Sequence, residues 1–279
     1  MIQLRRMKKK IILLIILLAL LILTGTGFFI WNRFFKAKAE IQSKADSEKT
    51  QAIPKVAEYK VPILMYHYIR DASGETEMGK KLSVSPENFR AQLQWLKGNN
   101  YQPIIVSDLA DPQKATISKV YFDKKSPIVF TFDDGYKDAY TQAFPLLKEY
   151  GFIGTFYIIK DYIGKGNYMS QSEIDELQKA GNEIGSHTLT HPDLTNISLE
   201  EARKQIFDSK GSATAFCYPS GKYNDAIIAL VKEASYLTAV TTHSGIANQN
   251  SDLFHLPRVR VEDGDGEVLK NKINSALNQ

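Results

Sequence analysis

From residue 59 onward, short apolar runs typical of buried strands alternate with amphipathic segments typical of helices. Strand-like runs are expected at residues 61–66, 128–132, 155–159, 183–185, 215–218, 238–241 and 259–261. Helical spacing of apolar residues lies between them, at residues 85–96, 139–150, 172–179, 198–207, 225–233 and 266–277. Such alternation predicts a parallel sheet with helices packed outside it, either open or closed into a barrel.

Polar residues follow directly after several of the strand-like runs. They are His67, Asp133-Asp134, His187, Pro219-Ser220-Gly221 and Thr242-His243. The carboxyl ends of parallel strands meet on one face of an α/β barrel, and active sites form on that face. We therefore expect these side chains to converge on a single site.

Two motifs supply the chemistry of that site. TFDDG carries two adjacent carboxylates, Asp133 and Asp134, and SHTLTH carries two imidazoles, His187 and His191, four residues apart. One carboxylate and two neutral imidazoles can hold a divalent metal and leave positions open for water and substrate. The second carboxylate is then placed to act as a base on that water. Together the motifs predict a metal-dependent hydrolase, whereas either one alone could be a turn cap or a pair of surface histidines.

TFDDG followed by SHTLTHPDL resembles the first two motifs of the polysaccharide deacetylases, carbohydrate esterase family four. The resemblance runs from about residue 59 to near the C-terminus and implies an α/β fold, a distorted (β/α)7-type barrel. It implies that Asp134, His187 and His191 bind the metal. It also implies that Asp133 is the general base, unless this carboxylate only orients another group. Zinc is the expected metal, and cobalt and nickel are the alternatives.

The general acid is less directly indicated. In the family it is a histidine of an L-x-H-like motif near the C-terminus, which this sequence lacks. Leu64-Met65-Tyr66-His67 instead precedes TFDDG, an order that resembles the permuted branch that deacetylates biofilm poly-N-acetylglucosamine. We expect His67 to be the acid and His243, in a mobile loop, to be the second candidate. Either histidine could instead be an ordinary hydrogen-bonded loop residue.

FCYPSG, at residues 216–221, resembles the third motif of the family, which forms one wall of the groove. Backbone N–H groups at such a turn can hold a developing oxyanion, so Ser220 is expected as the donor and Tyr218 as its neighbour beside the substrate. The family usually has an arginine, which orients the base, where this chain has Cys217. Arg258 is the expected substitute, although a structural salt bridge would account for it equally well. Cys217 itself is expected to be a small buried residue, not a nucleophile.

Several tyrosines lie close to these motifs in the sequence. They are Tyr66, Tyr68, Tyr136 and Tyr218. Aromatic rings beside such a site could stack on sugar rings, but ordinary barrel packing would explain them nearly as well. The sequence leaves these two interpretations open.

The N-terminal region has a different character. Residues 1–10 form a basic tail, and residues 11–31 form an apolar run long enough to cross a hydrocarbon core. The basic flank predicts a cytoplasmic N-terminus, hence a single-pass cell-membrane protein with an extracellular tether at 32–58 and a deacetylase domain at 59–279. A cleaved signal peptide, with Ala37-Lys38-Ala39 as its processing site, is the alternative.

The charge distribution limits the kinds of partner. Residues 1–40 carry eight Lys or Arg and one Glu, a formal charge of +7, which leaves −3 for the rest of a chain whose total is +4. The remainder has no basic excess, so nucleic-acid binding is not expected. The single cysteine rules out an intramolecular disulfide.

The sequence as a whole predicts a membrane-anchored N-deacetylase. Its expected partner is an extracellular polymer that contains N-acetylglucosamine, and poly-β-1,6-N-acetylglucosamine is favoured because of the position of His67 and the missing arginine. Peptidoglycan is the next candidate substrate. The third is an acetylated glycan, on which the protein would act as an O-acetyl esterase. A protein that binds glycans on the same fold without activity is the alternative of a different class.

Overall fold

The computed structural model describes residues 36, 58–111 and 113–278. The basic tail at 1–10, the apolar run at 11–31 and almost all of the tether lie outside the described residues. Within the part that is described, no helix is both long and apolar enough to cross a membrane.

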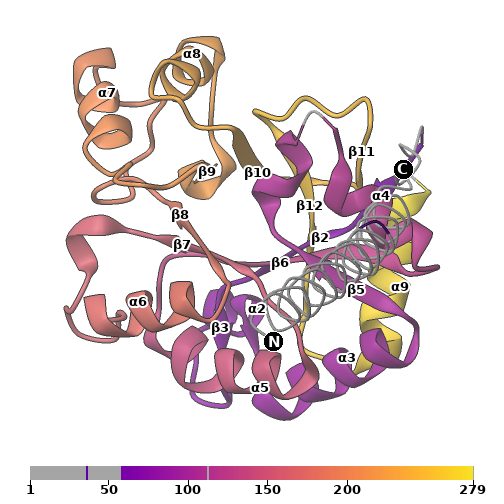
Figure 1. Cartoon of the computed structure of the whole chain (residues 1–279). Helices are drawn as coiled ribbons and strands as arrows, with labels where there is room; N and C mark the ends of the chain where they lie inside the picture. The colour runs from indigo at the N-terminus through magenta and orange to yellow at the C-terminus, as the bar shows by residue number, and fades with distance from the viewer. Residues whose placement is uncertain (1–35, 37–57, 112, 279) are drawn as a thin grey trace, which may run out of the picture. The chain divides into compact units, whose positions relative to one another are not determined.

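A closed barrel of parallel strands forms the centre of the domain (Figure 1). Around the ring the strands are β2 (Ile63–Tyr66), β12 (Leu256–Arg260), β10 (Thr238–Ser244), β9 (Ala215–Cys217), β8 (Glu183–Ser186), β7 (Thr155–Ile158) and β6 (Ser126–Phe132). The ring closes because β6 pairs with β2 from Ile63↔Val129 to Tyr66↔Phe132. This confirms the predicted (β/α)7-type barrel, and each strand overlaps a run that the apolar pattern identified.

One region adds structure that the sequence pattern did not indicate. Strand β5 (Tyr101–Ile104) pairs with the first half of β6, and η1 (Val106–Ala110) and α4 (Ala115–Phe122) connect the two. Two short sheets lie outside the barrel. They pair β1 (Lys60–Val61) with β11 (Ala247–Asn248), and β3 (Tyr68–Ile69) with β4 (Ser83–Val84) across α2 (Glu77–Leu82).

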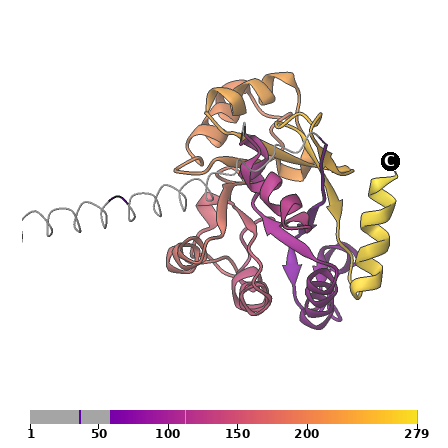
Figure 2. The ribbon, with the colours of Figure 1, turned by 45° about the vertical axis from the view of Figure 1, so that its right-hand side comes forward.

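Helices cover the outer face of the barrel (Figures 1 and 2). They are α3 (Pro86–Gly98), α5 (Phe144–Tyr150), α6 (Gln171–Lys179), α7 (Leu199–Phe207), α8 (Asp225–Glu233) and α9 (Gly266–Leu277). The expected helix at 139–150 begins as a π-helical turn, η2 (Ala139–Ala143), just before Pro145. Proline lacks the N–H that a regular helix uses at this point, so the turn widens.

The alternation of side chains along β6 decides what lies on each side of the barrel wall. Phe130 and Phe132 point outward and pack with Phe89 of α3 in the main apolar core. Thr131 and Asp133 have the opposite parity and are buried inside the barrel. The same strand therefore anchors the helical layer and brings a carboxylate to the barrel interior.

Candidate active site

The polar motifs meet where four strands end. His67 follows β2, Asp133 and Asp134 follow β6, His187 follows β8, and the turn containing Ser220 follows β9. The Asp133 N–H donates to the carbonyl of Tyr66 at 2.9 Å, which holds the ends of β2 and β6 together. Because all the strands of the closed ring run parallel, the motifs at their carboxyl ends lie on the same face of the barrel.

Asp133 is fixed by a buried arginine. Arg258 reaches inward from β12 and donates to both carboxylate oxygens, Nη1 to Oδ1 at 2.7 Å and Nη2 to Oδ2 at 2.8 Å. Only 1% of Arg258 and 3% of Asp133 are exposed. Burial alone would raise the pKa of Asp133, but the Arg258 guanidinium outweighs it and holds this pKa well below its usual range. The carboxylate therefore stays ionised and in one orientation.

Arg258 has further contacts that set its position. Its Nε donates to the carbonyl of Thr241 at 2.7 Å, and Nη1 donates to the Thr131 hydroxyl at 2.9 Å. Its Nη2 also lies 3.5 Å from the Cys217 sulfur, the position where the family usually has an arginine. The Arg258 guanidinium therefore reaches the site from β12, whereas an arginine at position 217 would reach it from β9.

Asp134, His187 and His191 come together as the metal-ligand set that was predicted. Oδ1 of Asp134 lies 3.4 Å from Nε2 of His187 and 3.6 Å from Nε2 of His191. One candidate ligand atom from each residue falls within 4.8 Å of the others. One carboxylate oxygen and two imidazole nitrogens at this spacing form a donor set that suits a divalent cation.

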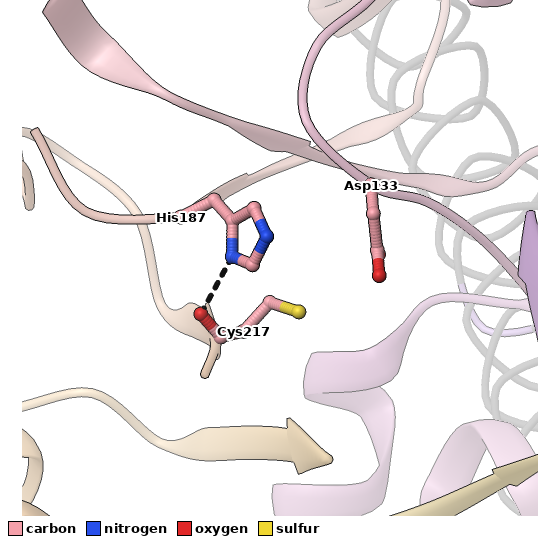
Figure 3. A group of neighbouring side chains, drawn as sticks. All are labelled: Asp133, His187 and Cys217. Carbon is pink, nitrogen blue, oxygen red and sulfur yellow. Dashed lines mark hydrogen bonds between the residues drawn. The ribbon is translucent and has the colours of Figure 1, made fainter. Parts of the chain in front are cut away.

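The orientation of His187 supports this fit. Its Nδ1 lies 2.7 Å from the carbonyl oxygen of Cys217, as the dashed line in Figure 3 shows. A ring nitrogen can approach a carbonyl oxygen this closely only as the donor, so Nε2 is the ring nitrogen that faces Asp134. Burial alone would lower the pKa of His187, but Cys217 and Asp134 outweigh it and raise this pKa, so Nε2 would release a proton when a cation binds. Burial and the neighbouring His187 lower the pKa of His191, which favours the neutral imidazole that metals bind.

A second group, Asp133, His187 and Cys217, is also close enough to hold a metal (Figure 3). It is the weaker candidate for three reasons. Asp133 is already neutralised by Arg258, burial raises the pKa of the Cys217 thiol, and the Nδ1 of His187 faces a carbonyl. Asp134 and the two histidines are therefore the better candidate for a cation site.

His67 lies beside the base. Its Nε2 is 3.8 Å from Oδ2 of Asp133, and its side chain is 15% exposed. Burial lowers the pKa of His67, against the opposing charge of the Asp133 carboxylate. The histidine is thus close to the catalytic groups and still open to a substrate.

Backbone strain is concentrated in these motifs. Asp134, Thr188, His191 and Ser220 have φ values of 72°, 68°, 60° and 55°. Non-glycine residues adopt this left-handed conformation at a cost of about 1–3 kcal/mol each, and they tend to do so where function requires it. At Ser220 the conformation places an exposed residue at the turn after β9.

Two predicted residues lie elsewhere. Tyr218 is fully buried and its hydroxyl donates to the carbonyl of Phe254 at 2.9 Å, so its side chain is not brought to a substrate. His243 is not in a mobile loop but near the exposed end of β10, where its Nδ1 lies 3.4 Å from the Tyr223 hydroxyl. Strand β10 continues past the expected end at residue 241 to Ser244, with a register shift against β12 between Val240 and Ser244.

The four tyrosines near the motifs divide into two kinds. Tyr66 and Tyr218 are buried and belong to the packing of the barrel. Tyr68 and Tyr136 are partly exposed, with ring centroids 4.2 Å apart. Barrel packing therefore accounts for Tyr66 and Tyr218, whereas stacking on sugar rings stays a prediction for Tyr68 and Tyr136.

Sequence reasoning missed Gln205, which holds the histidine loop. Its Oε1 accepts from the N–H groups of Leu189 and Thr190, each at 3.1 Å, and its Nε2 donates to the Thr190 hydroxyl. Gln205 is buried on the inner face of α7. The sequence did carry a signal for this role, because Gln205 lies among apolar residues on one face of the predicted helix.

Comparison with known proteins gives consistent results. A family model described as polysaccharide deacetylase matches residues 122–239. YxkH of Bacillus subtilis (strain 168), which is named as a polysaccharide deacetylase, is 31% identical over 239 residues, covering 82% of this chain and 81% of its own length. The poly-β-1,6-N-acetyl-D-glucosamine N-deacetylase of Staphylococcus aureus (strain N315) is 26% identical, over 77% of this chain and 84% of its own. The Streptococcus pyogenes deacetylase PplD, solved with acetate, is 29% identical with a TM-score of 0.68, over 78% and 99% of the two chains.

Proposed function

The chain belongs to the polysaccharide deacetylase family, a group of hydrolases that act on N-acetyl amide bonds, and we propose that its substrate is poly-β-1,6-N-acetylglucosamine outside the cell. The observation that carries the proposal is the placement of His67 beside the Asp133–Arg258 pair. This placement of His67 supports a general acid that comes from the N-terminal end of the domain, as in the permuted branch that deacetylates poly-N-acetylglucosamine. The similarity to the Staphylococcus aureus enzyme of that specificity supports the same substrate.

Asp134, His187 and His191 are proposed to hold the divalent metal on which the family depends. Zinc suits one carboxylate and two imidazoles, and cobalt or nickel would fit the same donors. When bound, the cation supplies Lewis acidity toward water and toward the acetamide carbonyl.

The remaining steps belong to side chains of this protein. Asp133 accepts a proton from water as the water oxygen bonds to the acetamide carbon. Arg258 keeps the carboxylate ionised and oriented for that transfer. The Ser220 N–H is proposed to donate to the developing oxyanion.

His67 completes the reaction. Its lowered pKa favours a neutral imidazole before the reaction, so His67 takes up the proton that Asp133 has removed from water. It then delivers this proton to the nitrogen as the carbon–nitrogen bond breaks, which leaves acetate and a free amine. The distance of 3.8 Å between Nε2 and Oδ2 of Asp133 is short enough to tighten to a hydrogen bond when substrate binds.

The decisive experiment measures acetate release by the purified protein. Three substrates are compared, with and without a chelator: poly-β-1,6-N-acetylglucosamine, peptidoglycan, and an O-acetylated glycan. We expect the fastest release from the first and none with the chelator present. Faster release from peptidoglycan would overturn the substrate, and polymer binding without acetate release would indicate a binding protein.

We also propose that residues 11–31 anchor the protein in the cell membrane and that residues 59–279 lie outside the cell. The length of the apolar run and its basic flank support this topology. Protease added to intact cells should remove the catalytic part. Protection from the protease would contradict export, and a mature protein that starts at Glu40 would contradict the anchor.

A further inference from the structure

A pocket is built on the segments that follow two of the site motifs. It has a volume of about 280 Å³, and its lining includes Tyr68, Arg70, Tyr136, Lys137, Asp138 and Asn167. Tyr68 follows His67 in the sequence, and Tyr136 is two residues beyond Asp134. Burial raises the pKa of the Tyr136 hydroxyl, and the charge of Asp134 raises this pKa further. The lining is therefore continuous with the segments of His67 and Asp134, and the volume is near the lower limit of small-molecule sites, about 300 Å³.

Two polar atoms in this lining have no partner. Nε of Arg70 and Oδ1 of Asp138 are buried and make no hydrogen bond within the described part of the chain. The other end of Arg70 is occupied, because Nη2 forms an ion pair with Glu75 at 2.9 Å. Leaving a buried polar atom unpaired is costly, and such atoms are few in folded proteins. One is a donor and the other an acceptor, which matches a ligand whose hydroxyl groups do both.

A row of aromatic rings starts at one wall of the pocket and extends beyond it. The Arg70 guanidinium lies 3.7 Å from the centroid of the Tyr68 ring, and Tyr68 packs on Tyr136 at 4.2 Å. The row continues through Tyr168 at 5.0 Å and Tyr162 at 4.8 Å. All four rings are partly exposed, and the Tyr162 hydroxyl donates to the carbonyl of Thr190, next to His191. The row thus borders the site from the segment of His67 to that of His191.

We propose that this pocket is a subsite for the sugar unit next to the one being deacetylated. Asp138 would accept a hydrogen bond from a hydroxyl of that unit, Arg70 would donate one, and the exposed amide of Asn167 would contribute from the rim. The lining holds two cations, Arg70 and Lys137, and each is already paired with a glutamate, Arg70 with Glu75 at 2.9 Å and Lys137 with Glu173 at 3.5 Å. Asp138 then disfavours an anionic ligand, so the pocket suits a neutral N-acetylhexosamine unit. The inference rests on the proposed function, and it makes the enzyme prefer oligomers to short fragments.

The test uses the purified full-length protein and N-acetylglucosamine oligosaccharides of the linkage that the wild type deacetylates. The measurement is the ratio of kcat/KM for the pentamer to kcat/KM for the dimer. Asp138→Ala and Asn167→Ala should each lower this ratio about two- to tenfold, the usual worth of one hydrogen bond. Asn167 is exposed, so its variant removes a side chain without disturbing the core. Asn250→Ala, near β11 at the opposite end of the barrel, is the matched control.

The subsite is overturned if Asn167→Ala and a folded Asp138→Ala both keep the wild-type ratio. It is also overturned if Asn250→Ala lowers the ratio as much as they do. If the wild type releases acetate from neither linkage series, the proposed function fails, and calorimetric titration with the two pentamers then decides on the subsite. Binding that Asn167→Ala weakens and Asn250→Ala does not would support the subsite, and any other pattern would overturn it.

Discussion

His67 and Arg258 approach the same oxygen of Asp133. Nη2 of Arg258 lies 2.8 Å from Oδ2, and Nε2 of His67 lies 3.8 Å from it. Arg258 is enclosed in the barrel, whereas His67 is partly open to solvent. The carboxylate therefore has a fixed cation on one side and a group able to exchange protons on the other.

This arrangement predicts a difference between two histidines. His67→Ala should lower kcat by about 10²–10⁴-fold on an acetylated substrate, the usual contribution of general acid–base catalysis. His243→Ala should have a much smaller effect, because His243 contacts Tyr223 on the exposed end of β10. Steady-state kinetics on both variants, with folding and metal content verified, makes the comparison. A larger loss for His243→Ala would contradict the assignment of the acid.

Arg258→Lys should lower kcat with little change in KM. Lysine keeps a positive charge beside Asp133 but cannot reproduce the two-point contact that fixes the carboxylate. A base that is less precisely oriented transfers the proton less often, so we expect kcat to fall by about 10- to 100-fold. Steady-state kinetics, with folding and metal content verified, makes the measurement. A wild-type kcat in the folded variant would mean that Arg258 has only a structural role.

Loss of any proposed ligand should remove the metal. Asp134→Ala, His187→Ala and His191→Ala should each lose bound metal together with activity, since three protein ligands leave no spare one. Asp133→Asn is the matched control, and it should keep the metal while losing most turnover, because an amide cannot accept the proton. Metal content measured by mass spectrometry separates the two groups. Stoichiometric metal in His191→Ala would remove His191 from the set.

Asp138→Asn should make the protein more stable near neutral pH. Burial raises the pKa of Asp138 to about 6, against the opposing charge of Arg70. A carboxyl whose pKa is higher in the folded state than in the unfolded chain binds its proton more tightly when folded. Its contribution to stability is therefore present at low pH and declines as the pH rises from about 4 to 6.

Replacing Asp138 by an uncharged amide removes that decline. The expected gain in the free energy of unfolding is about 1–2 kcal/mol at pH 7 and close to zero at pH 4. Urea unfolding at both pH values tests it, with Asp175→Asn, on the exposed side of α6, as the control. An equal gain at both pH values would show that the charge of Asp138 is not the cause.

Local sequence was sufficient for the strands, for most of the helices and for the grouping of the three candidate ligands. Apolar runs predicted the positions of the barrel strands because each strand is buried on both faces. Asp134, His187 and His191 could be proposed because their motifs are short and each follows a strand. The region from 101 to 122 escaped prediction because β5 depends on its pairing with the first half of β6.

The tertiary structure decided how the base is held and which aromatic groups are exposed. Arg258 lies 125 residues from Asp133 in the sequence. Nothing in its local sequence distinguishes an arginine that points into the barrel from one that forms a salt bridge on the outer face. The alternation of a strand tells which residues share a face, but only closure of the barrel makes one of those faces the interior. Closure brings β12 beside β2 and turns Arg258 inward to Asp133. Tyr218 is buried on the other side of the wall, in the cluster that β9 forms with α7 and α8. Tyr68 and Tyr136 lie beyond the ends of the barrel strands, so they remain partly exposed beside the site.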